Sequence, residues 1–203
     1  MEASAKAVPA CPSSPSRPGC PVRLSCLVGL FWENRSGLFS QNETAHSSSL
    51  KLLYVGRLHK LKGVEYLLDA IASLPNPQSV ELRLIGKDEG EGKALKEQSA
   101  KLKLNAKFEG IVSEEEKEAA YQWCDALVLP TLSENFGLVV AEALERGKRV
   151  ITTDGAPAWD NGNDYGGRLI YLRGYRCGSD AERLKLLSEA IAYVAPRYGL
   201  WMS

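Results

Sequence analysis

From residue 50 onward, short apolar runs alternate with longer stretches in which apolar residues recur at helical spacing. The run Leu50–Val55 is typical of a buried strand, and the stretch from Gly63 to Leu74 is typical of an amphipathic helix. Further strands are predicted at 80–85, 107–111, 125–129, 149–153 and 168–172, and further helices at about 93–104, 113–121, 137–145 and 180–194. Strands and helices that alternate in this way form a parallel sheet with helices on both faces. The pattern therefore predicts a doubly wound α/β domain.

The first 49 residues follow neither pattern. The stretch Cys11–Cys20 is rich in proline, serine and glycine, and the cluster Ser47–Ser49 closes the segment. No helical or strand period continues there for long enough to pack a core. We therefore expect two parts, a low-complexity or loosely ordered segment over 1–49 and a folded domain over 50–203.

The charge balance narrows the range of partners. The chain has 203 residues, and its 25 lysines and arginines match its 25 aspartates and glutamates. A nucleic-acid-binding protein usually carries a basic excess, so no nucleic-acid partner is expected. The longest apolar stretch, 24–32, is about half as long as the ~18 residues of a membrane helix, so no transmembrane segment is expected.

The cysteines and histidines argue against a metal site. The five cysteines are scattered without a C-x-x-C pair, and the only histidines are His46 and His59. Structural zinc sites require regularly spaced nitrogen and sulfur ligands, so none is expected. An odd number of scattered cysteines is typical of reduced thiols, which indicates a cytoplasmic protein. Peripheral attachment at the cytoplasmic face of the membrane remains an open alternative.

The loop after the first predicted strand carries candidate anion-binding groups. The segment Gly56–Gly63 contains Arg57, His59, Lys60 and Lys62 directly before a predicted helix. Ligands of doubly wound sheets bind at the carboxyl ends of the strands, and helix N-termini attract anions. A solvated basic loop would have the same composition. Neither a G-x-G-x-x-G fingerprint nor a P-loop is present, which argues against a dinucleotide-dependent dehydrogenase and a P-loop ATPase.

A second candidate segment, Pro130–Leu144, follows the strand predicted at 125–129. Glu134 and Glu142 lie eight positions apart, and Gly137 between them indicates that the helix begins there. Free backbone N–H groups at this helix start would bind phosphates, while the carboxylates would accept hydrogen bonds from sugar hydroxyls. A nucleoside diphosphate-sugar fits this arrangement. The alternative is that both glutamates only interact favourably with the helix dipole.

The segments Val55–Gly63 and Ser133–Glu142 together resemble those of the retaining, metal-independent glycosyltransferases of family 4 (group 1). The second segment matches the E-x7-E pattern of that family, including the Phe-Gly pair between the glutamates, and the first matches its Gly-Arg…Lys-Gly diphosphate loop. These enzymes have two facing Rossmann-like domains, the GT-B fold. The resemblance covers roughly 50–195 and implies the C-terminal, donor-binding domain alone.

The resemblance implies roles for particular residues. It places Arg57 and Lys62 on the donor diphosphate and Glu134 on the transferred sugar, as the catalytic groups, and Glu142 on the ribose. It implies no metal and no cofactor, with a UDP- or GDP-sugar as the donor substrate. The other donor-binding residues that it implies are Gly56, Ile111, Val112, Asn135, Phe136, Gly137 and Leu138.

The resulting hypothesis is a hexosyltransferase-type glycosyltransferase that acts on a glycan or a lipid-linked acceptor. In this family an N-terminal domain supplies most of the acceptor site, and residues 1–49 are too few to form one. The alternative is a truncated, non-catalytic nucleotide-sugar-binding module that needs an acceptor domain on a separate chain. A nucleotide-sugar epimerase of the same architecture fits the E-x7-E segment less well.

Overall fold

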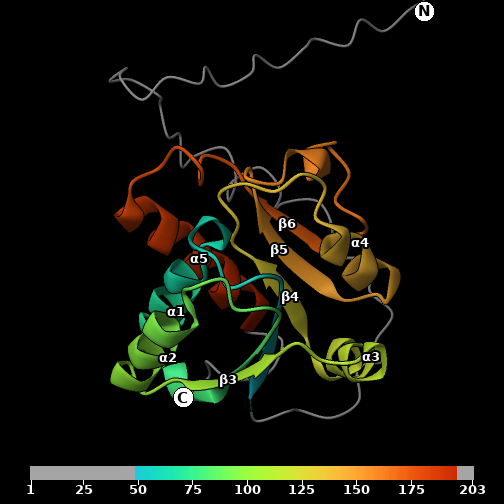
Figure 1. Ribbon diagram of the computed structural model, residues 1–203. Helices are drawn as coiled ribbons and strands as arrows, with labels where there is room; N and C mark the ends of the chain where they lie inside the picture. The colour runs from blue at the N-terminus through green and yellow to red at the C-terminus, as the bar shows by residue number, and fades with distance from the viewer. Residues whose placement is uncertain (1–48, 196–203) are drawn as a thin grey trace, which may run out of the picture. The chain divides into compact units, whose positions relative to one another are not determined.

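The computed structural model describes residues 49–195, so the segment 1–49 lies outside the described residues except for Ser49. The described residues form a six-stranded sheet in the order β3-β2-β1-β4-β5-β6, and all neighbouring strands are parallel (Figure 1). This arrangement confirms the predicted doubly wound sheet. The strands are β1 (Leu50–Val55), β2 (Val80–Ile85), β3 (Asn105–Gly110), β4 (Ala126–Leu129), β5 (Arg149–Thr153) and β6 (Leu169–Leu172).

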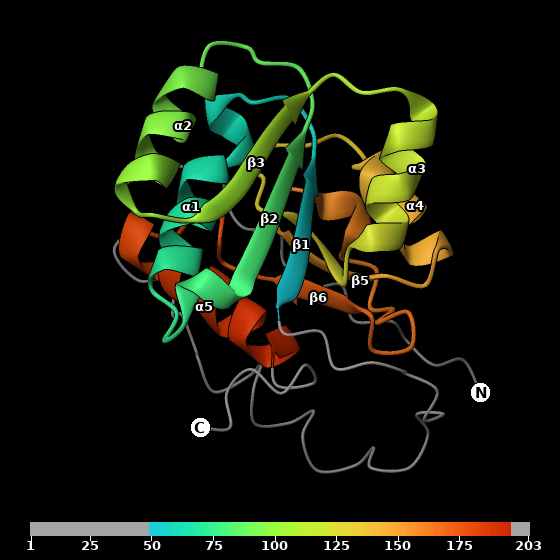
Figure 2. The same ribbon diagram turned by 90° about the horizontal axis from the view of Figure 1, so that it is seen from below.

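Helices cover both faces of this sheet, as the alternating pattern predicts. Figure 2 shows α1 and α2 on one face, with α5 beside them, and α3 and α4 on the other face. The helices are α1 (Val64–Ala72), α2 (Gly92–Lys101), α3 (Glu114–Trp123), α4 (Leu138–Glu145) and α5 (Asp180–Val194), with 3-10 turns η2 (Lys60–Lys62), η3 (Pro77–Ser79) and η4 (Pro157–Trp159). Within 49–195, no helix combines the length and the apolar character needed to cross a bilayer.

The core lies on both sides of the two central strands. All four residues of β4 are buried, and in β1 only Lys51 is partly exposed. A parallel strand with helices on both faces meets apolar surroundings on both sides, which explains these nearly continuous apolar runs. Leu67 and Leu68 of α1 and Leu187 of α5 are fully buried in the same core. Each such leucine contributes roughly 1.5–3 kcal/mol.

Local sequence determines where several helices begin and end. A capping box begins α3, because the Ser113 hydroxyl accepts from the Glu116 N–H while the Glu116 carboxylate accepts from the Ser113 N–H. The helix predicted to reach residue 104 ends instead at Lys101, since Lys103 adopts a left-handed conformation with φ 54°. Helix α4 begins at Leu138, one residue later than predicted.

The strand order reverses between β1 and β4. Strands β2 and β3 continue from one side of β1, whereas β5 and β6 continue from the far side of β4. Loops that follow neighbouring strands at such a reversal diverge to opposite faces of the sheet and leave a crevice at the carboxyl ends. Both candidate segments of the sequence, 56–63 after β1 and 130–137 after β4, lie at this reversal.

Candidate functional site

The loop after β1 is anchored from beneath by the sheet. The Gly56 N–H donates to the Ile85 carbonyl at 2.9 Å, which extends the pairing of β1 with β2 by one residue. The buried hydroxyl of Tyr54 donates to the Arg57 carbonyl at 2.7 Å. Burial, together with the negative charge of Glu134, raises the pKa of Tyr54 above its usual value, so its hydroxyl stays a donor. The backbone at Arg57 is therefore held in place.

Arg57 projects from this anchored loop toward solvent. Its side chain is 60% exposed and forms an ion pair with Glu89 at 2.9 Å. Glu89 belongs to the connector after β2, which is bound to the loop after β1 because Leu58 exchanges backbone hydrogen bonds with Lys87 and Glu89. The sequence pattern did not single out Glu89, since its contact with Arg57 depends on the pairing of β1 and β2.

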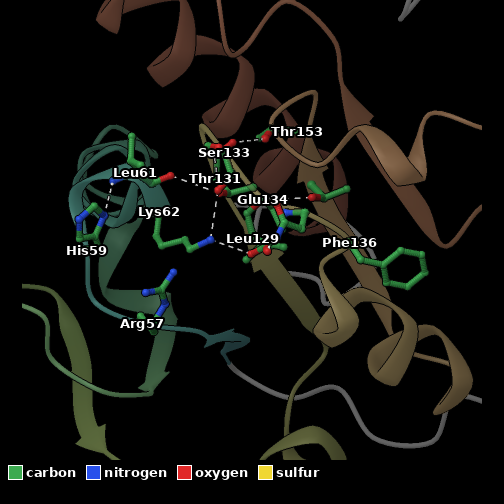
Figure 3. Close-up of polar contacts among 12 residues, drawn as sticks. Arg57, His59, Leu61, Lys62, Leu129, Thr131, Ser133, Glu134, Phe136 and Thr153 are labelled. Atoms are coloured by element: carbon green, nitrogen blue, oxygen red, sulfur yellow. Dashed lines mark hydrogen bonds and ion pairs between the residues drawn. The ribbon is translucent and has the colours of Figure 1, made fainter.

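Lys62 lies in a different environment from Arg57. It is only 6% exposed, and its Nζ contacts the Glu134 Oε2 at 2.7 Å and the Ser133 carbonyl at 3.1 Å (Figure 3). The structure thus joins two predicted site residues, one from each loop. Partial burial acts to raise the pKa of Glu134, but hydrogen bonds from Lys62 and from the Asn135 N–H outweigh burial and lower it. Arg57 is close enough to add to this lowering.

A set of buried hydrogen bonds holds these two loops together. The Leu132 N–H donates to the Leu61 carbonyl at 2.8 Å, and the Thr131 hydroxyl lies 3.2 Å from the same carbonyl. The Thr153 hydroxyl donates to the Thr131 carbonyl, and the Glu134 N–H donates to the Gly155 carbonyl at 2.8 Å. These contacts join the loops after β1, β4 and β5, which fixes the distance between Lys62 and Glu134.

The start of α4 faces the same loops. Gly137 has φ 72°, a left-handed conformation that costs other residues about 1–2 kcal/mol, and it turns the chain into the helix. The Trp159 Nε1 donates to the Phe136 carbonyl at 2.6 Å, which orients this turn. The N–H groups of Leu138 and Val139 open the helix and so have no acceptor within it. They are available to an anion.

Two exposed apolar side chains flank this helix start. Leu138 is exposed, and the half-exposed ring of Phe136 points away from Lys62 and Glu134 (Figure 3). The Phe136 ring packs against Trp159, with ring centroids 5.5 Å apart. Asn135 is exposed and directs its backbone N–H to the Glu134 Oε1 at 3.0 Å. The Phe136 ring therefore lies apart from the contact between Lys62 and Glu134.

Glu142 lies one turn into α4 and faces α3 rather than Lys62. Its Oε2 accepts from the Tyr121 hydroxyl at 2.8 Å and lies 3.5 Å from the Lys117 Nζ. Its side chain is 31% exposed. The two glutamates of the E-x7-E segment therefore have different cationic partners, Lys62 for Glu134 and Lys117 for Glu142.

Ile111 and Val112 follow β3, which lies two strands away from β1 in the sheet. Ile111 is 77% exposed, whereas Val112 packs partly against the core. Neither side chain takes part in the hydrogen bonds that join Lys62 and Glu134. Their contact with a nucleobase remains a prediction.

A parallel sheet of this order, with cations and a helix N-terminus at its strand-order reversal, defines a doubly wound α/β domain, a class whose ligands bind at the carboxyl ends of the strands. Residues 38–161 match the family model of the group 1 glycosyl transferases, and the chain belongs to that family. An uncharacterised glycosyltransferase of Methanocaldococcus jannaschii is 27% identical over 128 residues, which are 62% of this chain and 32% of that protein. The chain thus spans about a third of that relative's length.

Solved structures with the same fold include the C-terminal domain of a group 1 family glycosyl transferase from Francisella tularensis. It has a TM-score of 0.56 at 24% identity, over 74% of this chain and 80% of that chain. Anabaena HepE in complex with UDP and glucose has a TM-score of 0.53 at 25% identity, over 74% of this chain and 45% of that chain. The predicted resemblance to one half of a GT-B glycosyltransferase is confirmed.

Proposed function

We propose that residues 50–195 form the donor-binding part of a retaining, metal-independent glycosyltransferase that transfers a hexose from a nucleoside diphosphate-sugar. The observation that carries this proposal is the buried Lys62 ammonium, which lies 2.7 Å from Glu134 at the strand-order reversal. Family membership and the UDP and glucose bound to Anabaena HepE support the choice of ligand. A UDP-sugar is accordingly the first donor to test, and a GDP-sugar the second.

The proposed chemistry follows from the charges. When the bond between the anomeric carbon and the diphosphate oxygen breaks, its electron pair moves to the diphosphate. Arg57 and Lys62 would neutralise that developing charge, and the first N–H groups of α4 would bind a phosphate oxygen. Because Lys62 is already held by Glu134 and Ser133, it needs little reorganisation in the transition state. Glu134 would accept hydrogen bonds from hydroxyls of the transferred sugar.

The test uses charge removal at one exposed position and a matched control. Arg57→Met removes a 60% exposed cation, whereas Lys60→Met removes an exposed cation from the same loop that is not assigned to the diphosphate. Loss of a charge-assisted hydrogen bond weakens UDP or GDP binding by roughly tenfold or more in Arg57→Met, measured by calorimetry. Lys60→Met keeps an affinity within about twofold. Failure of the wild type to bind either nucleotide would refute the donor site.

A second candidate is a nucleotide-sugar-binding module that acts with an acceptor domain on another chain. The observation in its favour is that all the candidate groups come from the carboxyl edge of one sheet, whereas transfer also needs groups that hold the acceptor. Donor hydrolysis or transfer by this chain alone separates the two candidates. Measurable turnover excludes the binding-only module, and nucleotide binding without turnover favours it. A glycan or lipid-linked acceptor is proposed for the transferase.

A further inference from the structure

Glu142 is held from one side only. Both of its side-chain partners on α3, the Tyr121 hydroxyl and the Lys117 ammonium, approach the same oxygen, Oε2. Within residues 49–195, no hydrogen bond is formed to Oε1. The carboxylate therefore has one oxygen bound within the protein, while the other has no hydrogen-bond partner among residues 49–195.

Tyr121 is a fixed donor rather than a mobile surface group. Its side chain is fully buried, and the Arg146 guanidinium lies over its ring at 4.9 Å from the centroid. Burial and the hydrogen bond to Glu142 raise the pKa of the hydroxyl above its usual value, so it keeps its proton at neutral pH. Arg146 also donates to the Glu142 carbonyl at 2.7 Å, which fixes the backbone at the same position.

We propose that Tyr121 is a positioning residue, which orients the Glu142 carboxylate so that Oε1 accepts the ribose hydroxyls of a bound nucleoside diphosphate. The inference rests on the proposed donor function and on the ribose role that the family resemblance implies for Glu142. A glutamate side chain that is free in solution loses rotamer entropy when it binds a ligand. Because the bond to Tyr121 restricts this side chain before the ligand arrives, less is lost on binding. Lys117 supports the same orientation by its charge, from 3.5 Å away.

The experiment compares nucleotides that differ only in the hydroxyls that Glu142 would bind. Calorimetry measures UDP against 2′,3′-dideoxy-UDP, and GDP against 2′,3′-dideoxy-GDP, on the full chain. A charge-assisted hydrogen bond predicts that the wild type prefers the ribonucleotide by about tenfold or more. Tyr121→Phe should reduce that preference to about two- to threefold, with the dideoxynucleotide bound as in the wild type. If Tyr121 had a role in packing alone, Tyr121→Phe would weaken the binding of the ribonucleotide and of the dideoxynucleotide equally.

The matched control is Tyr66→Phe. It also removes a tyrosine hydroxyl that donates to a carboxylate, from Tyr66 to Asp180 at 2.7 Å, but on the side of α1 and α5. Tyr66→Phe should keep the full preference. If Tyr121→Phe is too unstable to measure, Lys117→Gln takes its place, because Lys117 is at a partly exposed position. The loss of one partly screened charge should lower the preference for the ribonucleotide by about two- to threefold.

The outcomes separate this inference from the function on which it rests. A wild type that binds ribo- and dideoxynucleotide equally overturns the ribose role of Glu142 and, with it, the positioning role of Tyr121. If the wild type prefers the ribonucleotide and Tyr121→Phe retains the whole preference, only the positioning role of Tyr121 is overturned. Loss of the preference in Tyr121→Phe and its retention in Tyr66→Phe support the proposal.

Discussion

Gly63 lies where the loop after β1 enters α1, and its replacement by alanine tests how tightly the loops after β1 and β4 are packed. Its φ is 64°, and a Cβ atom at this position would lie 2.3 Å from the Pro130 carbonyl oxygen. That distance is far below an ordinary contact, and the atom it meets is backbone. Gly63→Ala therefore has to move the loop after β1 away from the loop after β4.

The cost has two parts. A left-handed conformation costs alanine about 1–2 kcal/mol relative to the right-handed one. Separation of the loops also weakens the two hydrogen bonds that end on the Leu61 carbonyl, from the Leu132 N–H and the Thr131 hydroxyl. At roughly 1 kcal/mol each, they bring the expected loss of unfolding free energy to about 3–4 kcal/mol. For a protein of this size, that loss corresponds to a Tm lower by about 10 °C.

Gly162→Ala is the matched control. Gly162 also has a positive φ, 76°, but a Cβ atom there would have no heavy atom within 4 Å. Its replacement should cost only the conformational part, about 1–2 kcal/mol. Urea and thermal unfolding of both variants measure the difference. Equal losses in the two variants would refute the close packing of Gly63 against Pro130.

Three further predictions concern charges and caps around the site. The pKa of Glu134 is lower in the folded protein than its usual value of 4.5, so the ionised carboxylate stabilises the fold fully above pH ~4.5 and loses this effect as the pH falls through the folded pKa. The difference in unfolding free energy between wild type and Glu134→Gln should therefore shrink when unfolding is measured at increasingly acid pH. A difference that stays constant with pH would contradict this. Glu89→Gln frees Arg57 from an exposed ion pair and should tighten UDP binding in calorimetry by up to about fivefold, whereas Glu91→Gln should leave it unchanged. Ser113→Ala removes the cap of α3 and should lower the unfolding free energy by about 1 kcal/mol in urea; no change would argue against the capping box.

Elements with strong local patterns could be predicted closely. The bounds of β1, β2, β5 and α5 agree with the prediction, because glycine, proline or capping residues flank these elements. The end of α2 was predicted three residues too late, since nothing in the local sequence reveals the left-handed conformation of Lys103. Boundaries of this kind depend on how the following strand joins the sheet.

The candidate site was partly predictable for a similar reason. Arg57, Lys62, Glu134 and Glu142 follow β1 and β4, and residues after parallel strands lie at one edge of a sheet. Several residues that contact these segments were not predictable, because Glu89, Tyr121 and Trp159 come from other elements, 32, 21 and 23 positions away from their partners. Tyr54, Glu89, Tyr121 and Trp159 have no local feature that distinguishes them from ordinary core or surface residues, yet each one contacts a predicted site segment.

The sequence by itself determined the fold class, the positions of the two loops and the types of side chain that they carry. Periodicity, capping and spacing are local properties, because each depends only on residues that are close together in the sequence. Only the tertiary structure decided which charges meet. It paired Lys62 with Glu134 and turned Glu142 toward Tyr121, because strand order and helix packing bring residues 72 and 21 positions apart into contact.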